Sequence, residues 1–272
     1  MKVFLLIALA TYIIAAIHSV LAFLHKRRLL ENVSLIALTT GFAAHTGALF
    51  LDWYGNGHYP LFGLREALSF LAWTLVASYG LTLLRYRTLA LGSFISPVVV
   101  LFLFASLMSP DHQTAESAAL GGLDSAWLPI HTTLWIFAYA SLFVVFVASI
   151  MYILQERELR QKTFGTLFHR LPSLSVVNEI AATATTVGFS LITAGIISGI
   201  LLSWSRTGQV WHNDPKEVLA LLTWFLYFGL IFYRATRSWR GARAAWMGVL
   251  GFGLVICTFL GARLMGGYHI FG

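Results

Sequence analysis

Residues 3–24 read VFLLIALATYIIAAIHSVLAFL, an unbroken run that contains no Asp, Glu, Lys or Arg. A helix that crosses a bilayer needs about 20 consecutive, mainly apolar residues, and this run is long enough. The backbone amides of a membrane segment must find hydrogen-bond partners within the protein, so the segment is either a helix or a barrel strand. Barrel strands alternate apolar and polar residues, and this run does not. It also exceeds the core of a signal peptide and lacks a small-residue cleavage site, so we expect a permanent transmembrane helix.

Similar runs follow along the whole chain, which has 272 residues, 58% of them hydrophobic and 11% charged. Soluble domains carry about 25% charged residues, so this composition indicates a membrane protein. The fold class that we predict is all-α, a polytopic membrane helix bundle with about eight transmembrane helices. The predicted spans are residues 3–24, 33–51, 67–84, 88–108, 132–154, 176–204, 218–233 and 245–264. No internal repeat or separate soluble region is visible, so residues 1–272 are expected to form a single integral-membrane domain.

The basic residues gather in every second loop between these spans. These loops contain Lys26, Arg27, Arg28, Arg85, Arg87, Arg157, Arg160, Lys162, Arg170, Arg234, Arg237, Arg240 and Arg243. Most of the acidic residues fall in the other loops. The positive-inside rule places the basic loops in the cytoplasm and therefore both termini outside. The formal charge of +7 is explained by this arrangement in the lipid bilayer, and no nucleic-acid partner is expected.

The last basic loop has an arginine at every third position from Arg234 to Arg243, with Trp239 and Trp246 nearby. This pattern is typical of an interfacial turn whose long side chains reach the membrane surface. A site for anionic lipid is the alternative.

Two histidines lie at the outer ends of predicted spans. His131 opens the fifth span and His269 follows the eighth. A neutral imidazole is a common axial ligand of heme iron, and ligation by two histidines requires one imidazole on each porphyrin face. We therefore expect His131 and His269 to ligate heme b (iron protoporphyrin IX) at the outer face. The alternative for each residue is an interfacial histidine that bonds to water or a carbonyl.

His45 lies inside the second span, toward its outer end. An ionisable residue at that depth indicates a functional site, here a ligand for a second or transiting heme. The alternative is a hydrogen bond to a Ser or Thr of a neighbouring helix.

The outer loop before the seventh span carries aromatic and polar residues together. Trp211, with Trp53 and Trp204 from elsewhere in the chain, is suited to form an aromatic floor for a porphyrin, although Trp is also frequent at membrane interfaces. Asp214 precedes Pro215 and fits the N-cap of the seventh helix, with the proline in its first turn. The outer cations that could pair with heme propionates, or with nearby carboxylates, are Arg65, Arg206, Lys216 and Arg263.

Several classes of enzyme and redox protein are excluded by motif. The chain has no P-loop, HExxH or GxSxG pattern and no paired carboxylates within a span. It lacks CxxCH, and its single cysteine, Cys257, is expected to be a small core residue. The glycines and serines of the sixth span, including Gly188, Gly195 and Gly199, predict close helix packing.

These residues together resemble the CcsA/ResC-type cytochrome c assembly proteins of biogenesis system II, including their shorter HemX-like and YpjD-like members. The resemblance covers most of the chain, and its most specific part is Asp214-Pro215-Lys216-Glu217. The supporting segments are His45-Thr46, Trp53, Gly57-His58-Tyr59-Pro60-Leu61, Glu66, Leu128-Pro129-Ile130-His131, Tyr139-Ala140, Gly195-Ile196-Ile197-Ser198-Gly199, Leu221-Leu222-Thr223-Trp224 and Gly266-Gly267-Tyr268-His269. The chain departs from the family before Asp214, where the family's longer, tryptophan-rich WWD segment is reduced to Arg206–Asn213.

The resemblance implies heme transport or presentation at the outer face of the cell inner (cytoplasmic) membrane. It implies that His131 and His269 ligate an external heme, that His45 ligates heme in the membrane, and that Trp211 with Asp214 is the remaining platform. The implied partners are a ResB/CcsB-like membrane subunit and apocytochrome c, with this chain as a possible membrane subunit of a heme-attachment complex that has no catalytic motif of its own. The alternatives are a HemX-like regulator of tetrapyrrole synthesis, a b-type electron-transfer cytochrome and an unrelated transporter.

Overall fold

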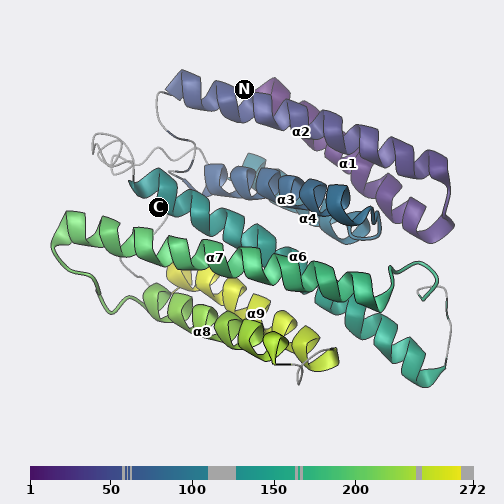
Figure 1. Ribbon diagram of the computed structural model, residues 1–272. Helices are drawn as coiled ribbons and strands as arrows, with labels where there is room; N and C mark the ends of the chain where they lie inside the picture. Colours follow the sequence, from purple (N-terminus) through teal and green to yellow (C-terminus); the bar gives the residue numbers. More distant parts are fainter. Residues whose placement is uncertain are drawn as a thin grey trace. The chain divides into compact units, whose positions relative to one another are not determined.

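The computed structural model describes residues 1–56, 59, 61, 63–109, 127–162, 165, 168–236 and 241–264. All the regular structure in these ranges is helical (Figure 1). The helices are α1 (Lys2–His25), α2 (Arg28–Asn56), α3 (Leu64–Tyr86), α4 (Gly92–Met108), α6 (Trp127–Gln161), α7 (Leu174–Thr207), α8 (Pro215–Ala235) and α9 (Ala242–Leu264). Each predicted span lies on one of these helices, except that α4 begins four residues later, at Gly92 rather than at residue 88. The expectation that Cys257 is a small core residue is wrong, because Cys257 is exposed on α9.

The predicted fold class is confirmed, because the described part of the chain holds seven helices long and apolar enough to cross a membrane. The eighth apolar helix, α4, is shorter, with 17 residues. The chain is therefore an all-α, multi-pass membrane protein. The outward orientation of its termini stays a prediction from the charge pattern.

The helices form two compact units, of which the first contains α1–α4 and the second α6–α9. In the first unit α1 packs against α2 and α4, and α3 packs against the same two helices. In the second unit α6 packs against α7 and α9, and α8 packs against the same two helices. Each unit is thus a ring of four helices in which neighbours in sequence are neighbours in space, the order typical of up-and-down bundles. That residues 1–272 act as a single domain stays a prediction.

Basic residues end the helices at two of the predicted cytoplasmic turns. Lys26 and Arg87 adopt left-handed backbone conformations, with φ of 49° and 51°, and their amides bond to the carbonyls of Ala22 and Leu83. A positive charge at a helix C-terminus is favoured by the helix dipole, and the left-handed cap pairs a carbonyl of the last turn. The cations that set the predicted topology therefore also end α1 and α3.

Candidate functional site

The imidazole of His131, in the second turn of α6, is bonded to the backbone of α7. Its Nδ1 lies 2.9 Å from the carbonyl oxygen of Gly195 and 3.3 Å from Oγ of Ser198. A carbonyl oxygen can only accept, so Nδ1 carries the hydrogen and donates it to Gly195. In the neutral ring the lone pair is then on Nε2, which is the nitrogen suited to coordinate a metal.

Glycines of α7 make room for this ring and for the aromatic residue one turn below it. A Cβ added at Gly199 would lie 2.7 Å from Cε1 of His131, and one at Gly195 would lie 3.0 Å from Nε1 of Trp135. Gly188 similarly faces Leu142. The sequence prediction of close packing through the glycines of this span is confirmed.

From His131 toward the C-terminal end of α6, aromatic rings lie on one face of the helix at intervals of four residues. His131 meets Trp135 edge-on with ring centroids 6.3 Å apart, and the Trp135 and Tyr139 centroids are 5.6 Å apart. Tyr139 then contacts Phe259 of α9 at 6.1 Å. These ring contacts connect His131 to α9, the helix that precedes His269 in the sequence. His269 itself lies outside the described residues, so its pairing with His131 stays a prediction.

Asp214 begins α8 as its N-cap. Its Oδ1 accepts a hydrogen bond from the backbone amide of Lys216 at 2.8 Å. Oε2 of Glu217 accepts one from the amide of Asp214 at 3.3 Å. These two bonds form a capping box, with Pro215 at the first helical position. The predicted cap is confirmed. Only 4% of Asp214 is exposed, so its carboxylate is buried at the start of α8 that it caps. Its part in a heme platform stays a prediction.

We expect Asp214→Ala to destabilise the second unit by about 1 kcal/mol, because the backbone amide of Lys216 would lose its hydrogen-bond acceptor. Thermal unfolding of the purified protein in detergent measures the change. Asp214→Asn keeps an accepting oxygen and is the matched control. If the alanine and asparagine variants unfolded at the same temperature, the cap would contribute nothing measurable.

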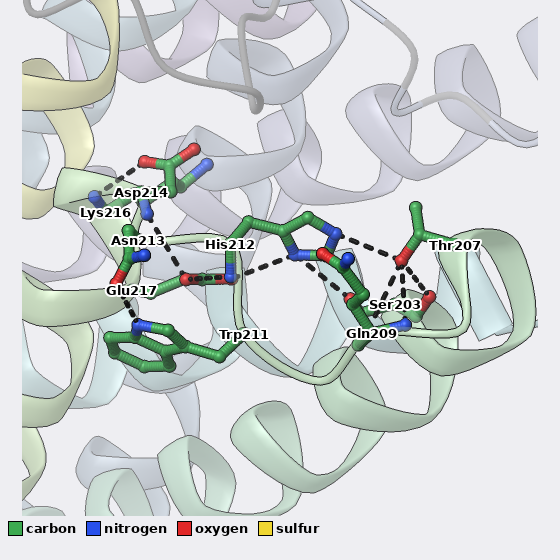
Figure 2. A network of polar contacts seen from close by, with 9 residues as sticks. All are labelled: Ser203, Thr207, Gln209, Trp211, His212, Asn213, Asp214, Lys216 and Glu217. Carbon is green, nitrogen blue, oxygen red and sulfur yellow. Dashed lines mark hydrogen bonds and ion pairs between the residues drawn. The ribbon is translucent and has the colours of Figure 1, made fainter.

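His212 is enclosed between the end of α7 and the start of α8 (Figure 2). Its Nε2 lies 3.0 Å from Oγ1 of Thr207, and its Nδ1 lies 3.3 Å from Oγ of Ser203 and 3.5 Å from Oε1 of Glu217. Its backbone amide donates to Oε2 of Glu217 at 3.0 Å. No local pattern predicted this network, because residues five to nine positions apart come together only once the loop has folded.

Three of the predicted aromatic and cationic residues of this region are exposed, whereas the cation Lys216 is half-buried. Trp204 and Trp211 are 61% and 41% exposed, and Arg206 is exposed in the last turn of α7. The indole Nε1 of Trp211 donates to Oδ1 of Asn213 at 2.8 Å (Figure 2). These side chains are thus available to a ligand or a partner at this end of the second unit.

In the first unit His45 ties three helices together. Its Nε2 lies 3.0 Å from Oγ of Ser69 on α3 and its Nδ1 lies 3.5 Å from the hydroxyl of Tyr12 on α1, while the ring is 0% exposed. This geometry is the hydrogen-bonded helix contact that the sequence offered as the alternative. A role of His45 as a heme ligand stays a prediction, and it would require the ring to leave at least one of these partners.

Trp53 also belongs to the first unit, near the end of α2. It is 52% exposed and meets Tyr59 edge-on, with ring centroids 6.1 Å apart. Trp204 and Trp211 belong to the second unit, so a floor shared by all three tryptophans stays a prediction. No group of three or more His, Cys, Asp or Glu suited to a metal ion occurs among the described residues. Axial ligation of heme needs only one or two protein ligands, so this finding does not conflict with His131.

Comparison with known proteins gives a family for this arrangement. The family model described as "Cytochrome C assembly protein" matches residues 61–269. The chain is 30% identical over 253 residues to the cytochrome c biogenesis protein CcsA of Heterosigma akashiwo, covering 81% of this chain and 79% of that protein. It is 33% identical over 231 residues to CcsA of Chlamydomonas reinhardtii, covering 82% of this chain and 64% of that protein. With CcsA of a Synechococcus species the identity is 29% over 268 residues, or 88% of both chains. The resemblance found in the sequence is thereby confirmed, and this chain belongs to the CcsA-type family of cytochrome c assembly proteins.

Proposed function

We propose that this protein binds heme b as its cargo and transports or presents it at the outer face of the cell inner (cytoplasmic) membrane for cytochrome c assembly. His131 and His269 are the proposed axial ligands. Family membership supports the part played in cytochrome c assembly. The proposal that heme is the cargo rests on the residues of the second unit.

The observation that carries the proposal is the hydrogen bond from Nδ1 of His131 to the Gly195 carbonyl at 2.9 Å. Histidines that ligate metals usually donate their other ring N–H to a carbonyl or carboxylate, which fixes the tautomer and the ring orientation. His131 has this arrangement, so the lone pair of its neutral ring is on Nε2, the nitrogen that would coordinate iron. The glycines of α7 allow the ring to lie close enough to make the bond.

The remaining groups suit the rest of the heme. Burial of the apolar porphyrin edge against the membrane-spanning helices would supply the largest part of the affinity. Trp211 and Trp204 offer exposed aromatic faces, and aromatic rings stack favourably on flat conjugated ligands. Arg206, exposed at the same end of α7, can pair with a propionate carboxylate.

Heme delivery requires partners, which we propose to be a ResB/CcsB-like membrane subunit and apocytochrome c. Thioether formation with a CxxCH site joins heme vinyl groups to thiols of the apocytochrome. The proposal therefore asks this chain to hold and orient heme, and it assigns no acid or base residue to the chain.

The short outer loop favours one alternative. The segment before Asp214 consists only of Arg206–Asn213, where the family's WWD segment is longer, so the chain could serve as a compact HemX-like regulator of tetrapyrrole synthesis. Deletion of the gene separates the two functions. Loss of cytochrome c with unchanged heme precursors supports presentation, and altered precursors with intact cytochrome c support regulation.

The experiment that tests heme binding is an absorption spectrum of the protein purified in mild detergent. We expect a bis-histidine heme spectrum from the wild type and its loss in His131→Ala and in His269→Ala, because each variant removes one axial ligand. Exposed His169→Ala is the matched control and should keep the spectrum. Heme retained unchanged in both ligand variants would remove these two residues from the site.

Absorption spectra and thermal unfolding of a His45 variant together test whether His45 ligates heme. His45→Gln keeps a polar group for Ser69, and we expect it to retain the external heme while lowering thermal stability. Loss of heme at unchanged stability would instead assign His45 to the ligand set.

A further inference from the structure

The imidazole of His212 links the last turn of α7 to the first turn of α8. Thr207 and Ser203 hold it from α7, at 3.0 Å from Nε2 and 3.3 Å from Nδ1. Glu217 faces Nδ1 from α8 at 3.5 Å. The side chain is only 14% exposed, so at the outer end of the unit this ring is part of the packing between the two helices.

The backbone around His212 is fixed as well. Glu217 Oε2 accepts the amides of both His212, at 3.0 Å, and Asp214, at 3.3 Å. On the other side of the loop, the carbonyl of Gln209 accepts from Oγ of Ser203 at 2.7 Å. The segment between these two anchors therefore has little freedom to move.

Trp211 is held between the same anchors. Its indole Nε1 donates to Asn213 at 2.8 Å, and Asn213 has a left-handed backbone with φ of 56°. The backbone is anchored at Gln209 before Trp211 and at His212 after it, while the ring of Trp211 is 41% exposed. Figure 2 shows the indole on the side of the loop away from the His212 ring.

We propose that His212 is a positioning residue for Trp211: its imidazole locks the loop to both helices, and the locked loop presents the indole to the heme. This inference rests on the proposed function, since heme is the ligand that Trp211 would meet. A rigid ring with two nitrogens suits this task, because one side chain contacts Thr207 with one nitrogen and Ser203 and Glu217 with the other.

A double-mutant cycle on heme affinity tests whether His212 acts through Trp211. We expect His212→Phe to weaken heme binding about two- to tenfold, the range for loss of one aromatic contact. In a Trp211→Phe background, His212→Phe should have no further effect on heme affinity, because the indole that His212 positions is absent. Equal losses in both backgrounds would overturn the proposal. His169→Phe, the same change at an exposed histidine, is the control and should leave the affinity unchanged.

Conservative variants identify which ring nitrogen of His212 supports heme affinity. His212→Gln places a polar group near the position of Nε2 and can keep the Thr207 contact, whereas His212→Asn replaces Nδ1 and can keep those to Ser203 and Glu217. We expect one of the two to restore heme affinity toward the wild-type value. If neither did better than His212→Phe, the hydrogen bonds of the ring would not be the cause.

Nuclear magnetic resonance of the heme-free protein tests the positioning without the proposed function. The indole N–H signal of Trp211 is assigned by its absence in Trp211→Phe. We expect it to shift and to exchange faster with solvent in His212→Phe. An unchanged signal in His212→Phe would overturn the inference even if the protein binds heme. A wild-type protein that binds no heme would refute the proposed function, and the signal would still show whether His212 holds the loop.

Discussion

Replacing Gly199 with alanine is expected to lower heme affinity about 10- to 100-fold, the range for disturbing a residue that supports a metal ligand. The added Cβ would lie 2.7 Å from Cε1 of His131, closer than a Cβ approaches another heavy atom in real structures, and 3.1 Å from Nδ1, which is a tight contact. The ring must therefore move, and its bond to the Gly195 carbonyl at 2.9 Å is the contact most directly disturbed. The affinity is measured by titrating heme into the heme-free protein and following its absorption.

The fold should survive this change, since alanine favours a helix over glycine by about 1 kcal/mol. Gly229→Ala on α8 is the matched control, because nothing lies within 4 Å of its added Cβ. We expect that variant to bind heme as the wild type does. A Gly199→Ala protein with full heme affinity would show that the placement of His131 against α7 is irrelevant to the ligand.

The second large effect is expected in the first unit, where Gly41→Ala should lower the free energy of unfolding by about 1–3 kcal/mol. Its Cβ would lie 2.6 Å from Oγ1 of Thr11 and from two ring carbons of Tyr12. Tyr12 is 0% exposed, so its ring has no space in which to retreat. Because the Tyr12 hydroxyl also faces His45 at 3.5 Å, the contact between α1, α2 and α3 would be disturbed with it.

Thermal unfolding in detergent measures this loss, and Gly80→Ala on α3 is the control because its Cβ would meet nothing within 4 Å. We expect the control to be as stable as the wild type or slightly more so. Equal unfolding temperatures for the two variants would show that α1 and α2 can separate at Gly41 without cost.

The fold class could be predicted from the sequence because it depends on local properties. Runs such as residues 3–24 and 132–154 are apolar enough to require helices wherever they lie in a bilayer. The cap at Asp214 was equally predictable, since Asp, Pro and Glu at 214, 215 and 217 act within one helical turn. The small residues of α7 predicted close packing, although not which side chain would fill the space.

The helical membrane architecture and the helix start at Asp214 could therefore be predicted from the sequence and are confirmed, whereas the short list of candidate heme-ligating histidines stays a prediction. The packing of the helices was needed to show what each histidine contacts. It bonded His131 to a carbonyl of α7, His45 to Ser69 and Tyr12, and His212 to residues from two helices. The physical reason is that these partners lie between 5 and 64 positions away in the chain. Local patterns fix the conformation of a segment, whereas the tautomer and orientation of an imidazole are set by whichever helix packs against it.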